Sequence, residues 1–355
     1  MSYFLDIHGP SEPIETACSS SLVAIHRAVV AIRSGGCDQA IVGGINTIVS
    51  PDGHICCNKA GMLSEDGKCK TFSKDADGYV RSEGVGILFL KKLKDAEASG
   101  DRIYGVIRGS AENHGGRANS LTAPNPKAQA ELIKTAYSKA KIDPRTVTYI
   151  EAHGTGTPLG DPVEINGLKA AFKDLYEVSK SNDFEMIEPH CGVGSVKTHI
   201  GHLELAAGVA GVIKVLLQLK HKKLIKNLHG EEQNPYIDLK NSPFYLVQEN
   251  QEWPVLMDSN GEVLPRRAGI SSFGFGGSNA HVIIEEYIPE AGITNASIQA
   301  PEISEAKPVL IVLSAKNEDR LKEYAEKLVT CIQNNPTADL ANVAYTLQVG
   351  REAME

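Results

Sequence analysis

Segments with strand-like and helix-like patterns alternate along most of the chain, and glycines lie at many of the junctions between them. Apolar residues that recur at helical spacing predict a helix over about 19–34, and the apolar run that follows predicts a buried strand over 39–45. Because strands that alternate with helices usually form a sheet covered by helices, we expect an α/β fold built on a mixed sheet.

The same patterns predict the other elements of the main part of the chain. Strands are expected at 79–90, 104–110, 147–152, 191–196, 268–273 and 281–285. Helices are expected at 126–141, where Asp143-Pro144 stops the pattern, and at about 203–222.

The composition changes after Tyr287. Residues 288–307 are rich in Ala, Pro, Glu, Ser and Ile without clear periodicity, which predicts a linker. Beyond it we expect a short strand at 309–313 and helices at 317–333 and 339–347. The final R-E-A-M-E holds no helix-capping Gly or Asn, so the last helix is expected to run on to the end of the chain.

Size and charge narrow the class of protein. The chain has 355 residues, of which 42% are hydrophobic, enough for one large domain with a packed core and a small appendage. A formal net charge of −8 argues against a nucleic-acid partner, which needs a basic face. Only 6% of the residues are aromatic, which argues against a surface that stacks bases.

The cysteines and the apolar segments indicate a cytoplasmic protein. Seven cysteines without a C-x-x-C pair favour neither a disulfide framework nor a zinc site, and free thiols are typical of a reducing compartment. The N-terminus lacks the pattern of a signal peptide. The longest apolar stretch, 203–219, is interrupted by Glu204, Lys214 and Gln218, so we expect a buried helix there and no membrane span.

One cysteine has the surroundings of a nucleophile. The segment E-T-A-C-S-S-S-L places Cys18 among small residues, between a short strand and the start of a helix. The free N–H groups and positive dipole end of a helix stabilise a thiolate, so the pKa of this thiol is expected to be lowered. A buried structural cysteine is the alternative, and the residues alone leave both open. The other six cysteines lack such surroundings, and Cys56-Cys57 is interpreted as core or loop packing.

Two histidines follow predicted strands. His153 opens the segment H-G-T-G-T directly after one strand, and His202 lies at the start of a helix, five residues after Lys197. Active sites of α/β proteins collect at such strand ends, and a thiol with two imidazoles could divide the work of carbon–carbon bond formation. His199 is a rival for the role of His202. There are two alternatives. Each histidine could be a core residue with its hydrogen bonds satisfied, or the Cys-His-His set could be a zinc site, although it lacks the usual short ligand spacing.

A glycine-rich run, S-S-F-G-F-G-G-S-N-A-H, lies between two predicted strands at 271–281. It lacks the Lys and following Ser or Thr of a phosphate-binding loop. A bulged hairpin and a turn whose backbone amides serve an oxyanion hole both stay open.

The chain holds four motifs in a fixed order, T-A-C-S-S-S, E-A-H-G-T-G-T-P-L-G-D-P-V-E, S-V-K-T-H-I-G-H-L-E and S-F-G-F-G-G-S-N-A-H. Their residues and their order resemble ketosynthases, the β-ketoacyl synthase domains of modular polyketide synthases. The resemblance implies a thiolase-like fold, layered α-β-α-β-α, over residues 1–287. It also implies an acyltransferase that performs a decarboxylative Claisen condensation.

The resemblance implies a role for each reactive side chain. Cys18 would take an acyl chain from the phosphopantetheine arm of an acyl carrier protein. His153 and His202 would assist decarboxylation of a malonyl-type extender and stabilise the enolate and the oxyanion. Lys197 matches the lysine that organises the second histidine. Neither a metal nor a cofactor bound by the domain itself is implied.

Further positions match residues that support the chemistry. Thr155 and Thr157 match threonines that contact the pantetheine arm. The backbone N–H groups of Phe275 and Cys18 match an oxyanion hole. The positions that match structural or supporting residues are Glu164 and Asn279.

The segment 308–355 resembles a truncated form of the region that follows ketosynthases in synthases whose acyltransferase acts in trans. No acyltransferase motif of the G-H-S-x-G kind occurs in the chain. A ketosynthase of fatty-acid synthesis is the alternative, and it would lack this tail.

The resemblance also implies that the domain is incomplete at its N-terminus. Complete members have several strands and helices before the nucleophile, whereas 17 residues precede Cys18 here. Missing strands would leave a sheet edge and apolar faces exposed. The expected partners are an acyl carrier protein, other polyketide synthase domains, a chain that supplies the missing part, and a second copy in a homodimer. An inactive remnant is the alternative to an active enzyme.

Overall fold

The computed structural model divides the chain into two compact units, Met1–Ile288 and Pro289–Glu355. The residues that the structure describes are 2–118, 120, 123–179, 189–258, 260–289, 308–336, 338–351 and 353–354. Most of the predicted linker, residues 290–307, lies outside the described residues.

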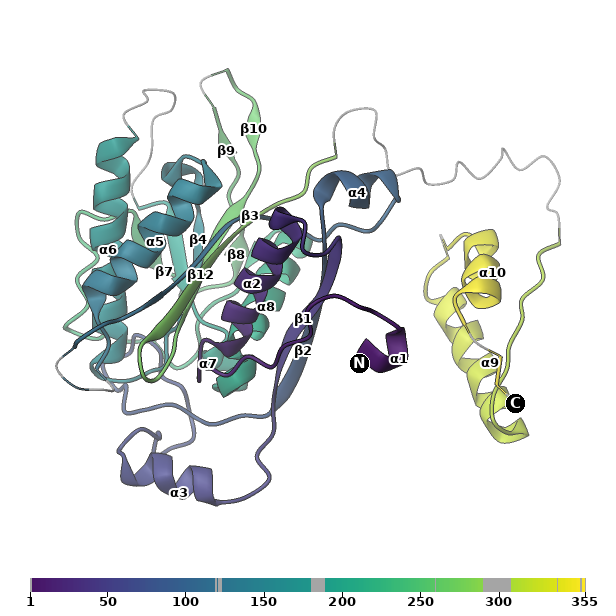
Figure 1. Ribbon diagram of the computed structural model, residues 1–355, viewed down its shortest axis with the longest axis horizontal. Coiled ribbons are helices and arrows are strands. Elements are labelled where there is room, and N and C mark those ends of the chain that lie inside the picture. Colours follow the sequence, from purple (N-terminus) through teal and green to yellow (C-terminus); the bar gives the residue numbers. More distant parts are fainter. Residues whose placement is uncertain are drawn as a thin grey trace. The chain divides into compact units, whose positions relative to one another are not determined.

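A six-stranded mixed sheet forms the centre of the first unit (Figure 1). Its strands, in spatial order, are β3 (Val106–His114), β12 (Ser278–Glu285), β11 (Arg267–Phe273), β4 (Tyr149–Glu151), β5 (Cys191–Gly194) and β7 (Phe244–Leu246). The first three pair antiparallel, and β11, β4, β5 and β7 pair parallel. The mixed α/β sheet expected from the sequence is confirmed.

Two pairs of helices cover the sheet, one pair on each face (Figure 1). α5 (Pro126–Ala140) and α6 (Gly160–Val178) pack on one face, and α2 (Ser20–Ser34) and α8 (Ala207–His221) pack on the other. Side chains alternate between the two cores along each strand, because successive residues of a strand point to opposite faces. On β12, Ile283 joins the first core, whereas its neighbours join the second.

The remaining elements are short or lie outside the central sheet. The helices and 3₁₀ turns of the first unit are α1 (Ser2–Leu5), α3 (Asp52–Lys59), α4 (Leu93–Ala98), η1 (Pro144–Thr146), α7 (Lys197–Ile200) and η2 (Glu204–Ala206). The strands are β1 (Gln39–Asn46), β2 (Gly84–Lys91), β6 (Lys223–Leu224), β8 (Gln251–Glu252), β9 (Leu256–Met257) and β10 (Val263–Leu264). None of the described helices is long and apolar enough to cross a membrane.

β1 and β2 form an antiparallel pair on the side of α2 and α8 that faces away from the central sheet, so the described residues show four layers, α-β-α-β (Figure 1). Val42 packs inward against the helices. The outward face carries the cross-strand pairs Ile41–Phe89 and Ile45–Val85, whose members are 37–66% exposed. Two apolar faces are typical of a sheet buried on both sides.

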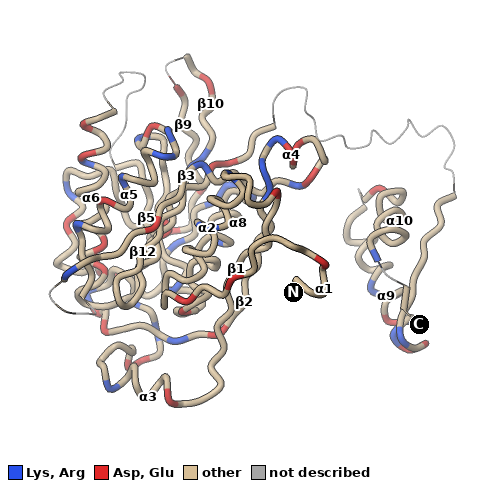
Figure 2. The backbone as a smooth tube through the Cα atoms, viewed as in Figure 1, with Lys and Arg blue, Asp and Glu red and all other residues tan. Residues whose placement is uncertain are grey.

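Charge is distributed unevenly over the first unit. α6 carries two lysines and four acidic residues, whereas β1 and β2 together hold a single charged residue, Lys91 (Figure 2). The outer surface of the β1–β2 sheet therefore offers apolar contact and almost no ion pairing.

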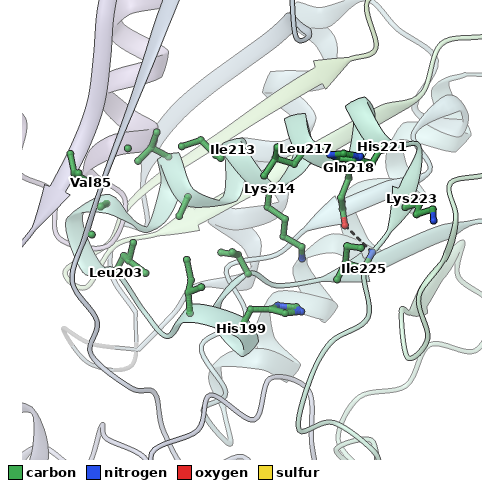
Figure 3. A pocket seen from close by; sticks show the side chains of 17 residues that line it. Val85, His199, Leu203, Ile213, Lys214, Leu217, Gln218, His221, Lys223 and Ile225 are labelled. Atoms are coloured by element: carbon green, nitrogen blue, oxygen red, sulfur yellow. Dashed lines mark hydrogen bonds between the residues drawn. The ribbon is translucent and has the colours of Figure 1, made fainter. Parts of the chain in front are cut away.

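A groove of about 630 Å³ runs along α8 beside β2 (Figure 3). Apolar side chains such as Leu203 and Ile213 line one part of it, and His199 and Lys214 line another (Figure 3). The Lys214 ammonium donates a hydrogen bond of 2.8 Å to the buried carboxylate of Glu151. The groove is thus mainly apolar, and the charge of the lysine in its wall is neutralised by Glu151.

One expectation for the first unit needs correction, and several elements, among them α6 and β7, were not predicted. The strand predicted at 79–90 begins only at Gly84, because Tyr79 and Arg81 instead form isolated bridges with Leu63 and His202. The helix expected at 203–222 is present, and it opens with the 3₁₀ turn η2 before α8.

The second unit holds two helices, α9 (Glu318–Gln333) and α10 (Leu340–Val349). Asn317 caps α9 by accepting the Arg320 N–H at 2.9 Å, which satisfies one of the free amides of the first turn. The expected strand at 309–313 is wrong, since those residues form no regular structure. The last helix ends at Val349, before Gly350, so its expected continuation to the end of the chain is also wrong.

Candidate active site

A cavity of about 810 Å³ lies at the carboxyl ends of the central parallel strands. Eight of the predicted site residues line it: Cys18, His153, Thr155, Thr157, Glu164, His202, Phe275 and Asn279. Lys197 is the predicted residue that is not among the lining residues. It lies buried in α7 with 3% of its surface exposed.

Cys18 lies in a tight turn just before α2. Ala17 has φ of +54°, a conformation that costs a non-glycine residue energy. Hydroxyl groups of the serine run hold the turn: the Thr16 N–H donates to Ser20 Oγ at 2.9 Å, and this hydroxyl donates to the Ala17 carbonyl at 2.6 Å. The serines of the motif therefore fix the backbone that carries the thiol.

The glycine-rich turn between β11 and β12 packs directly on this cysteine turn. A Cβ atom on Gly274 would lie 2.4 Å from the Thr16 carbonyl oxygen, so only glycine allows the approach. The approach brings the Phe275 N–H into a hydrogen bond with the Cys18 sulfur. Of the interpretations left open for this run, the turn that aims a backbone amide at the thiol agrees with the geometry.

The pKa of the Cys18 thiol differs from expectation. Burial raises it above its ordinary value, and this effect exceeds the lowering by the Phe275 N–H and by the charge of Lys197. The expected lowering at a helix N-terminus is therefore wrong, because the sequence does not reveal how completely the sulfur is removed from water. The thiol form prevails at neutral pH.

Two histidines converge on the thiol. The Cys18 sulfur and one ring nitrogen each from His153 and His202 all lie within 4.8 Å of one another. The two rings meet edge to face, with their centroids 5.6 Å apart. Burial and the charge of Lys197 hold the pKa of both imidazoles well below the usual range, so both are neutral at pH 7.

The surroundings of His202 assign its tautomer. Its Nδ1 accepts the backbone N–H of Glu204 at 2.9 Å, so the proton of the neutral ring is on Nε2. Nε2 is buried and has no hydrogen-bond partner among the described residues. His202 thus offers a hydrogen-bond donor to whatever occupies the cavity.

Two buried carboxylates at the start of α6 hold the loop that carries His153. Glu164 accepts the N–H groups of His153 and Gly154 at 2.7 and 2.8 Å, and Asp161 accepts that of Gly156 at 3.1 Å. Burial raises the pKa of Glu164, against the lowering by the two amides, and raises that of Asp161 to about 6. The supporting position expected for Glu164 agrees with this geometry.

The remaining predicted residues lie around the same cavity. The hydroxyl oxygens of Thr155 and Thr157 are 3.2 Å apart. The Asn279 amide donates to Asn113 Oδ1 at 3.1 Å, which ties β12 to β3. His199, the rival of His202, lines the groove along α8 and is not in the thiol–imidazole cluster.

Sequence reasoning missed several residues of the site. Asp161 belongs to a quoted motif and follows directly on the Gly-rich loop, which was a usable signal. Tyr79 packs its ring on His202 at 5.0 Å and donates its hydroxyl to Cys57 Sγ at 3.6 Å. Cys57 and its neighbour Cys56 line the cavity, although both were interpreted as packing residues.

The fold and the thiol–imidazole cluster are of the thiolase-like class, and the chain belongs to the β-ketoacyl synthase family. Models of its N-terminal domain, its C-terminal domain and the ketoacyl-synthetase C-terminal extension match residues 1–96, 104–231 and 234–354. Within the family, the chain is a ketosynthase of the polyketide synthase type.

Its relatives among known sequences are polyketide synthases. The chain is 66% identical over 357 residues to polyketide synthase PksN of Bacillus subtilis (strain 168), with 100% of this chain and 6% of that protein covered. It is 44% identical over 359 residues to polyketide synthase ThaG of Burkholderia thailandensis, with 100% and 6% covered. The chain therefore spans a small part of these relatives.

Solved ketosynthases share its fold. The ketosynthase from module 6 of the bacillaene synthase from Bacillus subtilis 168 matches with a TM-score of 0.85 and 44% identity over 99% of this chain and 57% of that one. The oxazolomycin ketosynthase domain OzmH KS7 from Streptomyces albus JA3453 matches with a TM-score of 0.87 and 44% identity over 99% and 58%. These matches confirm the expected thiolase-like ketosynthase fold.

Proposed function

We propose that this chain carries out acyl transfer and decarboxylative Claisen condensation in polyketide synthesis. The observation that carries the proposal is the convergence of the Cys18 sulfur with the ring nitrogens of His153 and His202, all within 4.8 Å, in a cavity that the Phe275 N–H also serves. A nucleophile, neutral imidazoles and an amide donor are the groups that this reaction needs.

In the first step, the Cys18 sulfur attacks the thioester carbonyl of an acyl chain carried on phosphopantetheine. The N–H groups of Cys18 and Phe275 stabilise the oxyanion that forms. The bond from the carbonyl carbon to the pantetheine sulfur then breaks, and the proton lost by Cys18 ends on the departing pantetheine thiol. The raised pKa of Cys18 makes the removal of that proton part of the barrier.

In the second step, a malonyl-type extender on a carrier protein loses CO2 and forms an enolate. His153 and His202 stabilise the enolate oxygen by hydrogen bonding, as a neutral imidazole with a free N–H can. The enolate carbon attacks the acyl group on Cys18, and the sulfur leaves as a thiolate. The Nε2–H assigned to His202 supports this role, because it leaves the donor unpaired in the cavity.

The other predicted residues serve these two steps from outside the reacting atoms. Lys197 stabilises the thiolate and keeps both imidazoles neutral through its charge. Thr155 and Thr157 contact the pantetheine arm. The structural and supporting residues are Glu164 and Asn279.

The domain itself binds no cofactor in this proposal, and its substrates arrive on the phosphopantetheine of an acyl carrier protein. Other proposed partners are polyketide synthase domains, a polypeptide that supplies the missing N-terminal part of the ketosynthase and, in a homodimer, a second copy of this chain. The apolar outer face of the β1–β2 sheet supports contact with additional polypeptide, because a sheet with two apolar faces is usually covered on both. Free cysteines at all seven positions support a cytoplasmic setting.

We assign residues 1–287 to the ketosynthase domain, 288–307 to a linker and 308–355 to its flanking region. The match of the ketoacyl-synthetase C-terminal extension to residues 234–354 supports a family-specific tail. The resemblance of this tail to those of synthases whose acyltransferase acts in trans supports that subtype.

The test is acylation of the whole chain by an acyl-pantetheine thioester, located by intact-protein and peptide mass spectrometry. We expect one adduct on Cys18, which disappears in Cys18→Ala and persists in Cys57→Ala, a matched variant that removes another thiol of the same cavity. A folded chain without any adduct would support an inactive remnant. One equivalent of bound zinc that is lost in Cys18→Ala would instead assign the cluster to a metal.

A further inference from the structure

His202 is held between two segments of backbone. Its N–H donates to the Val80 carbonyl at 2.7 Å, and its carbonyl accepts the Ser82 N–H at 2.9 Å. Arg81, the residue between them, therefore lies directly beside His202, and the two form an isolated bridge. This backbone pairing fixes the main chain of the histidine, but it does not decide which ring nitrogen carries the proton.

A single backbone donor decides the tautomer, and that donor lies in a strained conformation. The Glu204 N–H donates to His202 Nδ1 at 2.9 Å. Glu204 has φ of +44°, a left-handed conformation that costs a residue with a Cβ atom roughly 1–2 kcal/mol. Such a conformation persists only where surrounding contacts hold it, and the side chain of Glu204 makes contacts of this kind.

The Glu204 carboxylate is clamped by a two-pronged ion pair. Arg81 Nε donates to Oε1 at 2.6 Å and Nη2 donates to Oε2 at 3.0 Å. The two side chains are only 11% and 17% exposed, so water screens the pair little. Asn46 at the end of β1 adds a third donor to Oε2 at 3.3 Å. Paired hydrogen bonds of this kind fix orientation as well as contributing energy.

The guanidinium of Arg81 is itself held in place. Its Nη1 lies 3.3 Å from His54 Nδ1 in α3. A Cβ atom on Gly53, in the first turn of that helix, would lie 2.3 Å from Nη1. The N-terminal turn of α3 therefore packs against the guanidinium and restricts its movement.

We propose that Arg81 and Glu204 are positioning residues that keep the proton of the His202 imidazole on Nε2. The ion pair holds Glu204 in its left-handed conformation, which aims the Glu204 N–H at Nδ1 and leaves Nε2–H for the substrate. Neither residue touches the reacting atoms. The effect on rate rests on the role proposed for His202, whereas the effect on the tautomer does not.

The direct test is ¹⁵N NMR of the full chain labelled at histidine, with the His202 signals assigned by their loss in His202→Gln. The native chain is expected to show Nε2 protonated and Nδ1 bare. In Glu204→Ala the strained conformation loses its clamp, and the two tautomers are expected to mix. In Glu204→Gly the native tautomer is expected to return, because glycine adopts positive φ without cost and keeps its N–H.

Two variants of Arg81 distinguish the effect of losing the Arg81–Glu204 ion pair from the effect of a general loss of structure. Arg81→Gln is expected to mix the tautomers, and Arg81→Lys to do so less, since lysine keeps the charge but not the two-pronged geometry. Arg266→Gln is the matched control, because the Arg266–Glu286 pair is similarly buried, at 10% and 14% exposure. A native tautomer in both Glu204→Ala and Arg81→Gln would overturn the proposal. If Arg81→Gln fails to fold, the Ala–Gly pair at Glu204 decides it.

Kinetics distinguish this proposal from the proposed function. In Arg81→Gln, kcat for condensation is expected to fall about tenfold, while KM for the extender and the acylation rate of Cys18 stay within about twofold. A mixed tautomer with native kcat would overturn the role proposed for His202 and leave the positioning role standing. A native tautomer with a reduced kcat would overturn the positioning role alone.

Discussion

The buried thiol of Cys18 has a raised pKa, which has a measurable consequence for its reactivity. Because burial raises this pKa above its ordinary value, the thiol form prevails at pH 7. The alkylation rate of Cys18 by iodoacetamide is therefore expected to keep rising as the pH increases from 7 to 9, with no plateau near pH 7. Peptide mass spectrometry of timed samples gives the rate at this cysteine.

The charge of Lys197 lowers the pKa of the same thiol, so Lys197→Met is expected to slow alkylation at every pH in this range. Lys173→Met, at an exposed lysine of α6, is the control, and its profile should match that of the native chain. A plateau near pH 7 in the native chain would contradict the raised pKa.

At the scale of single residues, the sequence predicted which residues form the site, but it did not predict how their surroundings shift their pKa values. Cys18, His153 and His202 could be chosen from their motifs, because the motif residues are also the reactive ones. The direction in which the pKa of the Cys18 thiol shifts could not be predicted, since it depends on burial by residues from distant parts of the chain. The Arg81–Glu204 pair joins positions 123 residues apart, and no local pattern marks it.

At the scale of elements, the contact between the Cys18 turn and the β11–β12 turn depends on the absence of one side chain. Gly274→Ala would place a Cβ atom 2.4 Å from Thr16 O and 2.7 Å from Ser278 O. The two turns must separate, which breaks the hydrogen bond from Phe275. We expect acylation of Cys18 to slow by about tenfold to a hundredfold, as the loss of one oxyanion donor usually costs at least that.

Gly115→Ala is the control for this change. Gly115 lines the same cavity, and a Cβ atom there would lie no closer than 3.6 Å to its neighbours. Its acylation rate should stay within about twofold of native. Equal rates for both variants and the native chain would show that the turn contact does not serve the thiol.

The elements found from sequence are those with a regular pattern and clear ends. α2 and α5 match their predicted bounds within one residue. α6 was missed although Ile165, Leu168 and Phe172 repeat at helical spacing, because its Gly-Asp-Pro start and the interior Gly167 weaken the helix signal. The strand predicted from residue 79 began too early, because residues 79–82 pair with loops that only the tertiary fold brings close.

At the scale of the whole molecule, buried histidines link stability to pH. Burial lowers the pKa of His281 to about 3, whereas an unfolded histidine titrates near 6.5. Below pH 6.5 the unfolded chain therefore takes up a proton that the folded chain does not, and stability falls as the pH falls. For this group alone, the loss between pH 7 and 4.5 is on the order of 3 kcal/mol.

The variant His281→Asn isolates that contribution from other titrating groups. Its destabilisation relative to the native chain, measured by urea unfolding, is expected to be larger at pH 7 than at pH 4.5. A destabilisation that is the same at both values would show that His281 is protonated normally in the folded state.

The outer face of the β1–β2 sheet is expected to make the chain associate with itself when nothing else covers it. Ile87→Lys places a charge at the centre of that face, where Ile87 is 52% exposed. This change should reduce association in sedimentation velocity runs over a concentration series. Val178→Lys, at an isolated residue 84% exposed at the end of α6, should leave association unchanged. Equal association in both variants would show that the outer face of the β1–β2 sheet does not drive association.

The class of the fold and the identity of the site were accessible from sequence. The family resemblance implied five layers, α-β-α-β-α, of which the described residues show four. Alternating strands and helices indicated the mixed sheet, and four ordered motifs indicated the family. An exposed apolar face was expected from the missing strands, but the sequence did not place it on β1 and β2, since a strand with two apolar faces looks the same in sequence whether or not a neighbour covers it.

The contact between Cys18 and Phe275 also sets the order of events during synthesis. The two residues lie near opposite ends of the first unit, so a ribosome that adds 5–20 residues per second reaches Phe275 roughly ten to fifty seconds after Cys18. Until then the nucleophile lacks the turn that packs against it. The nascent chain thus carries a thiol without its amide donor, and the active site closes only when almost the whole unit has left the ribosome.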